Sequence, residues 1–244
     1  MAMTDDSPAA LLAPYYHGEH DMVTVSAQQG SGFAKDIAGD HNPIHDVDAP
    51  RFCVPGDLLF ALIVKHYGLA RQMTLTFRGM LRANTPLRFP VEPPPSFSIT
   101  DETGRDYVGI EGGPPMPTPR SAQCKLIEAY VACSGQTFPD LLQPLLKTHE
   151  VMFNPERPLV VYDSMALNFD RPLSTSPTLT LTHANLEVSG KRGDARFDFD
   201  ILENGHVIGQ CWKKMVVSGL RAYNSEAMGA VVERYQARRA AAGA

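Results

Sequence analysis

Residues 52–66, FCVPGDLLFALIVKH, combine a chain break with an apolar segment that follows at once. Pro55 and Gly56 break the chain, and Asp57 stands where a helix N-cap or first-turn acid is expected. The next residues are apolar on nearly every side of a helix, as expected of a helix buried inside a fold: Leu58, Leu59, Ala61, Leu62, Ile63 and Val64. Unpaired backbone N–H groups at the start of such a helix favour negative charge. The segment therefore predicts a buried helix whose first turn can polarise a carbonyl oxygen.

The segment just before it, residues 33–45 (FAKDIAGDHNPIH), carries an acid and a base. Pro43 lacks a backbone N–H and disfavours helical geometry at the residue before it, so the chain must leave a helix and form a tight loop. Asp40 and His45 stand at the two ends of this loop. Histidine can exchange a proton at neutral pH, and a nearby carboxylate can orient or share that proton. The alternative is structural, an Asx turn of Asp40 and Asn42 that caps the helix end.

A known hydratase motif resembles these two segments. MaoC-like (R)-specific enoyl-CoA hydratases and dehydratases carry it, and the matching residues here are Gly39-Asp40-His41-Asn42-Pro43-Ile44-His45 followed by 52–59. That family has the hotdog fold, in which a curved antiparallel sheet wraps a long apolar helix. Outside these two segments, the chain resembles that family only in its general pattern of residues. The whole chain also resembles an uncharacterised bacterial family of about this length, which carries the same motif and brings no activity with it.

The resemblance implies roles for individual residues. Asp40 and His45 would be the catalytic acid–base pair, and Gly56, at the start of the central helix, would provide the oxyanion hole. Three further residues are implied to contact the substrate: Asn42, Pro55 and Asp57. The chain has Pro55-Gly56 where that family usually has His-Gly before the helix.

Two parts of the chain match at a constant offset. Pro55-Gly56-Asp57-Leu58-Leu59 through His66 is echoed by Phe138-Pro139-Asp140-Leu141-Leu142 through His149. A strand of similar pattern follows each segment, Met73–Phe77 after the first and Met165–Phe169 after the second. A repeat of this length indicates two copies of one supersecondary unit, and chance similarity of two helix starts is the alternative. With the resemblance, the repeat predicts an α+β fold, a double hotdog, with units at 1–120 and 121–244.

The second copy has no acid–base pair, because residues 133–139 (CSGQTFP) offer no Asp or His at the matching positions. We therefore expect one active site per chain, formed by the first unit and walled by the second. Alternating patterns predict strands over 75–89, 97–110, 178–188, 196–202 and 207–218, with a polar turn at 190–194 and a hairpin at Asn204-Gly205. Helices are expected over 121–133 and 225–239.

Composition excludes several functional classes. The chain has 244 residues, 43% of them hydrophobic, which is enough for one large domain or two small ones. Its net charge of −5 makes binding to a nucleic-acid backbone unexpected. We find neither an apolar stretch of about 18 residues nor a secretory signal, so no membrane association is expected. The histidines form no metal-ligand pattern, and no metal is predicted. Four dispersed cysteines, Cys53, Cys124, Cys133 and Cys211, predict a reducing cytoplasmic location, with Cys53 more typical of a small core residue than of a reactive thiol.

The predicted reaction is the reversible addition of water to a trans-2-enoyl thioester of coenzyme A or acyl carrier protein, as in fatty acid metabolism. His45 and Asp40 would bind the water and handle its protons, while amides near Gly56 would hold the thioester oxygen. Two alternatives are thioester hydrolysis on the same fold and non-catalytic binding of an acyl group or another small ligand. No cofactor is expected besides the acyl carrier, and the chain would act as a monomeric pseudo-dimer or as a homodimer.

Overall fold

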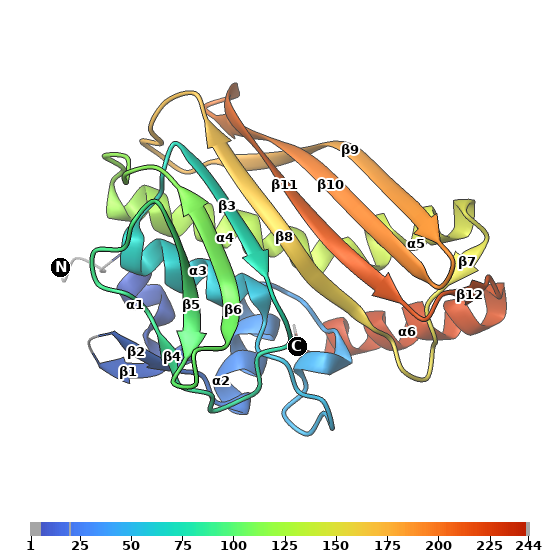
Figure 1. The fold of residues 1–244 in the computed structure, drawn as a ribbon. Coiled ribbons are helices and arrows are strands. Elements are labelled where there is room, and N and C mark those ends of the chain that lie inside the picture. The colour runs from blue at the N-terminus through green and yellow to red at the C-terminus, as the bar shows by residue number, and fades with distance from the viewer. Residues whose placement is uncertain (1–5, 20, 243–244) are drawn as a thin grey trace.

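The fold was obtained as a computed structural model that describes residues 6–19 and 21–242. Within these residues, ten strands form one antiparallel sheet in the order β1-β2-β4-β5-β6-β3-β8-β11-β10-β9, and the long helices α3 and α4 lie behind it in the view of Figure 1. The strands are β1 His17–Glu19, β2 Met22–Thr24, β3 Gln72–Phe77, β4 Leu87–Arg88, β5 Ser96–Asp101, β6 Asp106–Gly112, β7 Val151–Met152, β8 Val160–Phe169, β9 Thr178–Ser189, β10 Arg192–Glu203, β11 His206–Ser218 and β12 Arg221–Ala222. The helices are α1 Pro8–Leu12, η1 Ala13–Tyr15, α2 Ala27–Gly32, η2 Phe33–Ile37, η3 Pro43–His45, α3 Gly56–Tyr67, α4 Arg120–Gln136, η4 Thr137–Leu141, α5 Leu142–Thr148 and α6 Ser225–Ala242.

Two halves of this sheet have the same strand connectivity. In the first half, β3 follows α3, and the next three strands add to its outer edge in the order β6, β5, β4. In the second half, β8 follows the helical segment α4–α5, and the next three strands add in the order β11, β10, β9. The fold is therefore α+β, a double hotdog, as the sequence predicts. The division of the chain near residue 120 remains a prediction.

The central strand pair joins the halves symmetrically. β3 and β8 are antiparallel, and Thr74 pairs with Ala166. These two residues occupy equivalent places in the repeated segments Met73–Phe77 and Met165–Phe169, so each strand pairs with its own counterpart about that point. Such self-complementary pairing is what a two-fold axis between copies of one unit produces.

Helix α3 is enclosed as the apolar pattern predicts, because residues 58–64 are each at most 4% exposed. Burial of each large aliphatic side chain contributes roughly 1.5–3 kcal/mol. Gly56 begins the helix where a Cβ atom would lie 3.3 Å from Tyr162 and 3.4 Å from Phe77. Glycine thus lets the N-terminus of α3 approach strands from both halves closely.

The second long helix, α4, confirms the helix expected over 121–133, and its Tyr130 ring contacts Phe60 of α3 with centroids 4.8 Å apart. The echo of the α3 start at residues 139–148 has a different form. It begins in the kinked turn η4, where Phe138 has non-helical φ and ψ, and continues as the seven-residue α5. The repeated sequence segment therefore forms the short helix α5 in the second half, and the long helix of that half, α4, precedes it.

Strand expectations hold in the second half and fail partly in the first. β9, β10, β11 and the hairpin at Asn204-Gly205 match the predicted ranges, and both hairpin residues have positive φ, as a type I′ turn requires. The polar turn is shorter than predicted, because β10 already begins at Arg192. The strand expected over 75–89 ends at Phe77, and 97–110 is the hairpin of β5 and β6. Gly79 and Asn84, both with positive φ, turn the chain out of the sheet between β3 and β4.

In residues 6–19 and 21–242 we find no helix with the length and apolar character that crossing a membrane requires.

One buried carboxylate ties the loop after β8 to the end of β10. Glu203 is 2% exposed and accepts hydrogen bonds from the backbone N–H groups of Ser174 and Thr175 and from Arg171. Burial alone would raise the pKa of Glu203, but these hydrogen bonds outweigh it and lower the pKa to about 2.

Replacement of Glu203 with glutamine is expected to lower the free energy of unfolding at pH 7 by about 1–3 kcal/mol, because the N–H groups of Ser174 and Thr175 and the Arg171 side chain lose an ionised acceptor. The folded pKa lies below the ordinary value of 4.5, so this stabilisation is present above pH 4.5 and is lost as the pH falls towards 2. Urea unfolding at pH 7, 5, 4 and 3 should therefore show the two proteins converging at low pH. Parallel pH profiles would contradict this role.

Candidate active site

The loop that carries the acid and the base begins at a helix C-terminus. Helix η2 ends before Gly39, which adopts a left-handed conformation with φ of 64°, and the Asp40 N–H then donates to the Ala34 carbonyl at 2.7 Å. A glycine in this conformation is the usual way to satisfy the last carbonyls of a helix and reverse the chain. It brings Asp40 back over the end of η2.

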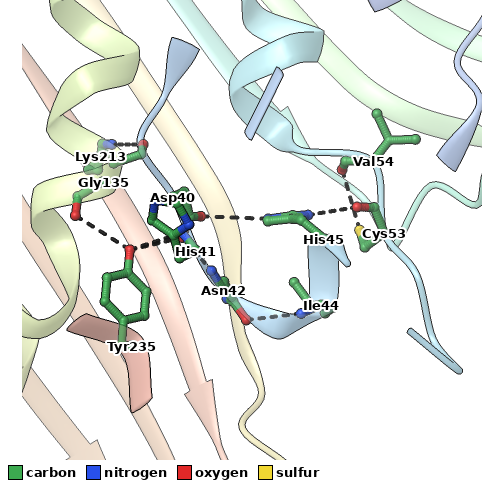
Figure 2. A network of polar contacts seen from close by, with 11 residues as sticks. Asp40, His41, Asn42, Ile44, His45, Cys53, Val54, Gly135, Lys213 and Tyr235 are labelled. Atoms are coloured by element: carbon green, nitrogen blue, oxygen red, sulfur yellow. Dashed lines mark hydrogen bonds and ion pairs between the residues drawn. The ribbon is translucent and has the colours of Figure 1, made fainter. Parts of the chain in front are cut away.

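The Asx turns expected as the structural alternative are present. Asp40 Oδ1 accepts from the Asn42 N–H at 2.9 Å, and Asn42 Oδ1 accepts from the Ile44 N–H at 3.2 Å to cap η3. These bonds use only one oxygen of the Asp40 carboxylate. The second oxygen, Oδ2, faces His45 Nε2 at 3.7 Å (Figure 2). The turn thus fixes the carboxylate and leaves one oxygen towards the histidine.

The orientation of His45 is set by its other ring nitrogen. Nδ1 lies 2.7 Å from the Cys53 carbonyl oxygen, which can only accept, so the neutral ring carries its proton on Nδ1. Nε2 then has a free lone pair directed towards Asp40. Two proton acceptors, one imidazole nitrogen and one carboxylate oxygen, therefore converge, and both side chains are mostly buried, with 12% and 21% exposed.

A tyrosine from the C-terminal helix completes this group. The Tyr235 hydroxyl of α6 accepts from the His41 N–H at 3.1 Å and lies 3.3 Å from Asp40 Oδ1 (Figure 2). Burial, and next the Asp40 charge, raise the pKa of Tyr235, so its hydroxyl stays protonated. Sequence reasoning missed this residue because it lies 195 positions from Asp40, in a helix without any recognisable motif.

The pair opens into a cavity of about 360 Å³. Its lining includes Asp40, His45, Asn42, Gly56 and Asp57 among the predicted site residues, and Ile44, Leu59, Phe77, Val160 and Met215 among the apolar ones. Pro55 is buried at the N-cap position of α3 and does not line the cavity; its carbonyl accepts from the Leu58 N–H. The structure therefore brings five of the six predicted residues to one cavity.

Asp57 is a buried member of the lining: it is 5% exposed, and its Oδ1 has no hydrogen-bond partner in the described part of the chain. Burial raises the pKa of this carboxyl, while the charge of Lys213 and hydrogen bonding by Ser134 act in the opposite direction. Sequence reasoning placed Asp57 correctly at the first turn of α3 but gave no sign of Lys213 or Ser134 beside it.

Cys53 is not a reactive thiol. Its Sγ donates to the Val54 carbonyl, and burial raises the pKa of the thiol to about 11. Because the thiolate is the nucleophilic form, Cys53 is a packing residue at neutral pH. Across residues 6–19 and 21–242, no group of three or more His, Cys, Asp or Glu side chains is arranged to hold a metal ion.

Fold and site together define a double-hotdog protein with one Asp–His pair in the cavity described above. The chain belongs to the family described as "Protein of unknown function (DUF3581)", whose model matches residues 10–226. No curated protein matches the sequence.

Solved structures are similar to this chain in fold alone. An acyl-CoA thioesterase II, TesB2, from Mycobacterium marinum is 12% identical with a TM-score of 0.42, over 88% of this chain and 98% of the other. A conserved protein of unknown function with a hot dog fold from Alicyclobacillus acidocaldarius is 9% identical with a TM-score of 0.43, over 85% and 98%. The full-length peroxisomal multifunctional enzyme type 2 from Drosophila melanogaster is 13% identical with a TM-score of 0.41, over 80% and 48%.

Proposed function

We propose that this protein catalyses the reversible addition of water to a trans-2-enoyl thioester, with Asp40 and His45 as its acid–base pair. The supporting observation is that His45 Nε2 and Asp40 Oδ2 lie 3.7 Å apart on one cavity wall, each with acceptor capacity free. A water molecule can donate one hydrogen to each of them. That arrangement directs a water lone pair into the cavity, where it can attack the β-carbon.

The proton movements follow from the two acceptors. As the water oxygen bonds to the β-carbon, one of the pair takes a proton from it, and a proton is returned from the pair to the α-carbon. The Nδ1 hydrogen bond to the Cys53 carbonyl holds the ring in the tautomer that can accept at Nε2. Asn42 and Tyr235 hold Asp40 Oδ1, so that Oδ2 keeps its direction.

The developing negative charge falls on the thioester oxygen, and the start of α3 suits it. The first amides of a helix have no intrahelical acceptor, and they carry the positive end of the helix dipole. Gly56 supplies such an amide at the cavity wall. Residues from both halves of the sheet line this cavity, which supports a site built by one chain acting as a pseudo-dimer.

The direct test is to incubate the purified protein with crotonyl-CoA and, separately, with butyryl-CoA. Loss of the absorbance of the conjugated thioester, with formation of 3-hydroxybutyryl-CoA, is the expected result for the first. The saturated thioester should stay intact. Release of free thiol from butyryl-CoA would instead indicate a thioesterase, and tight binding without turnover of either would indicate an acyl-binding protein.

A charged groove at the cavity edge suggests that the acyl carrier is coenzyme A. The groove, of about 470 Å³, shares Asn42, Ile44 and Met80 with the cavity, and it is lined by three exposed arginines: Arg51, Arg157 and Arg221. Guanidinium groups suit the phosphates of a nucleotide carrier. Glu156 is the acidic residue among them.

Replacement of these three arginines by serine is expected to raise the KM for crotonyl-CoA by about tenfold, because three exposed charge pairs of about 0.2–1 kcal/mol each are lost. Hydration of crotonyl-pantetheine, which lacks the nucleotide, is the matched control and should keep its KM. An equal rise for both substrates would place the nucleotide elsewhere. Added salt should likewise raise the KM of the wild-type protein for crotonyl-CoA, because it screens the attraction between the arginines and the nucleotide phosphates.

A further inference from the structure

The proposed mechanism leaves one buried polar cluster beside the cavity unused. Lys213 of β11 is 1% exposed, and its Nζ lies 2.6 Å from Ser134 Oγ of α4 (Figure 2 shows the lysine). The ammonium also lies 5.1 Å from the ring centroid of Tyr130 and 5.3 Å from that of Tyr162. Burial of a charged group lowers stability unless the group is paired and hydrogen-bonded. These contacts therefore stabilise a lysine at a position where an apolar side chain would carry no such desolvation penalty.

The direction of the hydrogen bonds makes Ser134 a donor. An ammonium only donates, so Ser134 Oγ accepts from Lys213 and its own hydrogen must point elsewhere. Tyr130 and Tyr162 bond to each other through their hydroxyls at 2.5 Å. In this structure Ser134 hydrogen-bonds to Asp57, and a ligand carbonyl can compete for the same hydrogen, since Ser134 and Asp57 both line the cavity. Polarisation by the ammonium strengthens this donor.

The backbone of α4 places Ser134 next to the reacting groups. The Gly135 N–H donates to the Ala38 carbonyl at 3.1 Å, so α4 meets the chain just before Asp40. Asp57, the neighbour of Ser134, follows Gly56 at the start of α3. Ser134 and Gly56 therefore both adjoin Asp57 in the lining of one cavity, and they come from opposite halves of the fold.

We propose that Ser134 is a catalytic hydrogen-bond donor to the carbonyl oxygen of the acyl thioester, and that Lys213 is the positioning residue that polarises it. This inference rests on the proposed function for the identity of the ligand, but not on hydration as the reaction. With this role, the second unit contributes a residue that contacts the substrate, whereas the sequence predicted that this unit only lines the site. The oxyanion site then has two donors of different kinds, a backbone amide and a charge-assisted hydroxyl.

The test uses a ligand that can be neither hydrated nor hydrolysed. The dethia analogue of butyryl-CoA, in which a methylene group replaces the thioester sulfur, is labelled with ¹³C at the carbonyl and bound to the full-length protein. Isotope-edited infrared spectroscopy then reports the carbonyl stretching frequency, and titration reports the Kd. We expect a lower frequency on the wild-type protein than in water, and in Ser134→Ala a return towards the value in water with a Kd about 10-fold higher.

Lys213→Met should move the frequency in the same direction by a smaller amount, and should add nothing in a Ser134→Ala background, because it acts through the hydroxyl. Ser164→Ala removes a buried hydroxyl that does not line the cavity, and it is the matched control with unchanged frequency and Kd. An unchanged frequency in Ser134→Ala would overturn the inference, as would an acyl group found on Ser134 by mass spectrometry after incubation with butyryl-CoA. Failure of hydration alone would not, since the readout needs no turnover.

Discussion

Asp40→Asn is expected to lower kcat for the proposed hydration of crotonyl-CoA by about 10²–10⁴-fold, the usual contribution of one positioned acid–base group. The amide oxygen can still accept from the Asn42 N–H, so the turn should persist. The amide nitrogen, however, would donate to His45 Nε2 and block the lone pair that receives the water. Stopped-flow or steady-state absorbance measurements give kcat, while KM should change little because the cavity keeps its shape.

His45→Gln should cause a loss of similar size, because an amide cannot accept and then return a proton at neutral pH. His183, on the exposed side of β9, provides the matched control, and His183→Gln should leave kcat and KM unchanged. Combination of Asp40→Asn with His45→Gln should cost little more than either change alone if the two side chains act as a unit. Near wild-type rates in both single variants would remove these residues from the chemistry.

Local sequence signals predicted the parts of the site that neighbouring residues build. The Pro-Gly break and the apolar run after it fix the start and burial of α3, and the glycine–proline loop fixes where Asp40 and His45 stand. Each of these features depends on backbone preferences within a few residues. For that reason they could be read without knowledge of the fold.

Contacts between distant segments could not be read in this way. Tyr235 reaches Asp40 across 195 positions, and Lys213 reaches Ser134 across 79. Lysine in an alternating strand pattern normally indicates an exposed face, so nothing local marks Lys213 as buried. Its place follows from the packing of β11 against α4, which depends on the whole sheet being formed.

The first-half strands show the reverse difficulty. Residues 75–89 alternate well enough to suggest one strand, yet β3 ends at Phe77 and the chain leaves the sheet. The residues that follow include Met80 and Leu81, which line the cavity, so their apolar character serves the site and not the sheet. Val54 N–H donates to the Leu81 carbonyl and ties this loop to the start of α3. A hydrophobic pattern reports burial, and it does not by itself distinguish a strand from a buried loop.

Gly135→Ala should disturb both stability and the proposed activity, because α4 meets the loop that carries Asp40 and His45 at this residue without any room for a side chain. A Cβ atom there would lie 2.4 Å from the Ala38 carbonyl oxygen and 2.6 Å from that of Gly39, and both are backbone atoms that cannot rotate away. Overpacking of this kind costs about 1–3 kcal/mol, and Tm falls by about 2–4 °C per kcal/mol in a protein of this size. The displaced loop carries Asp40, and a misplacement of about 1 Å can lower kcat by about 10²-fold.

Gly229→Ala is the matched control, since it introduces the same methyl group into helix α6 at a position where a Cβ atom meets nothing within 4 Å. There the loss of backbone freedom in the unfolded chain should raise the free energy of unfolding by about 0.4–1 kcal/mol and leave kcat unchanged. Thermal unfolding and crotonyl-CoA hydration, measured on both variants, compare the two sites directly. If Gly135→Ala kept the wild-type Tm and kcat, α4 would not hold the Asp40 loop in place, and the argument that places Ser134 beside the reacting carbonyl would lose its structural basis.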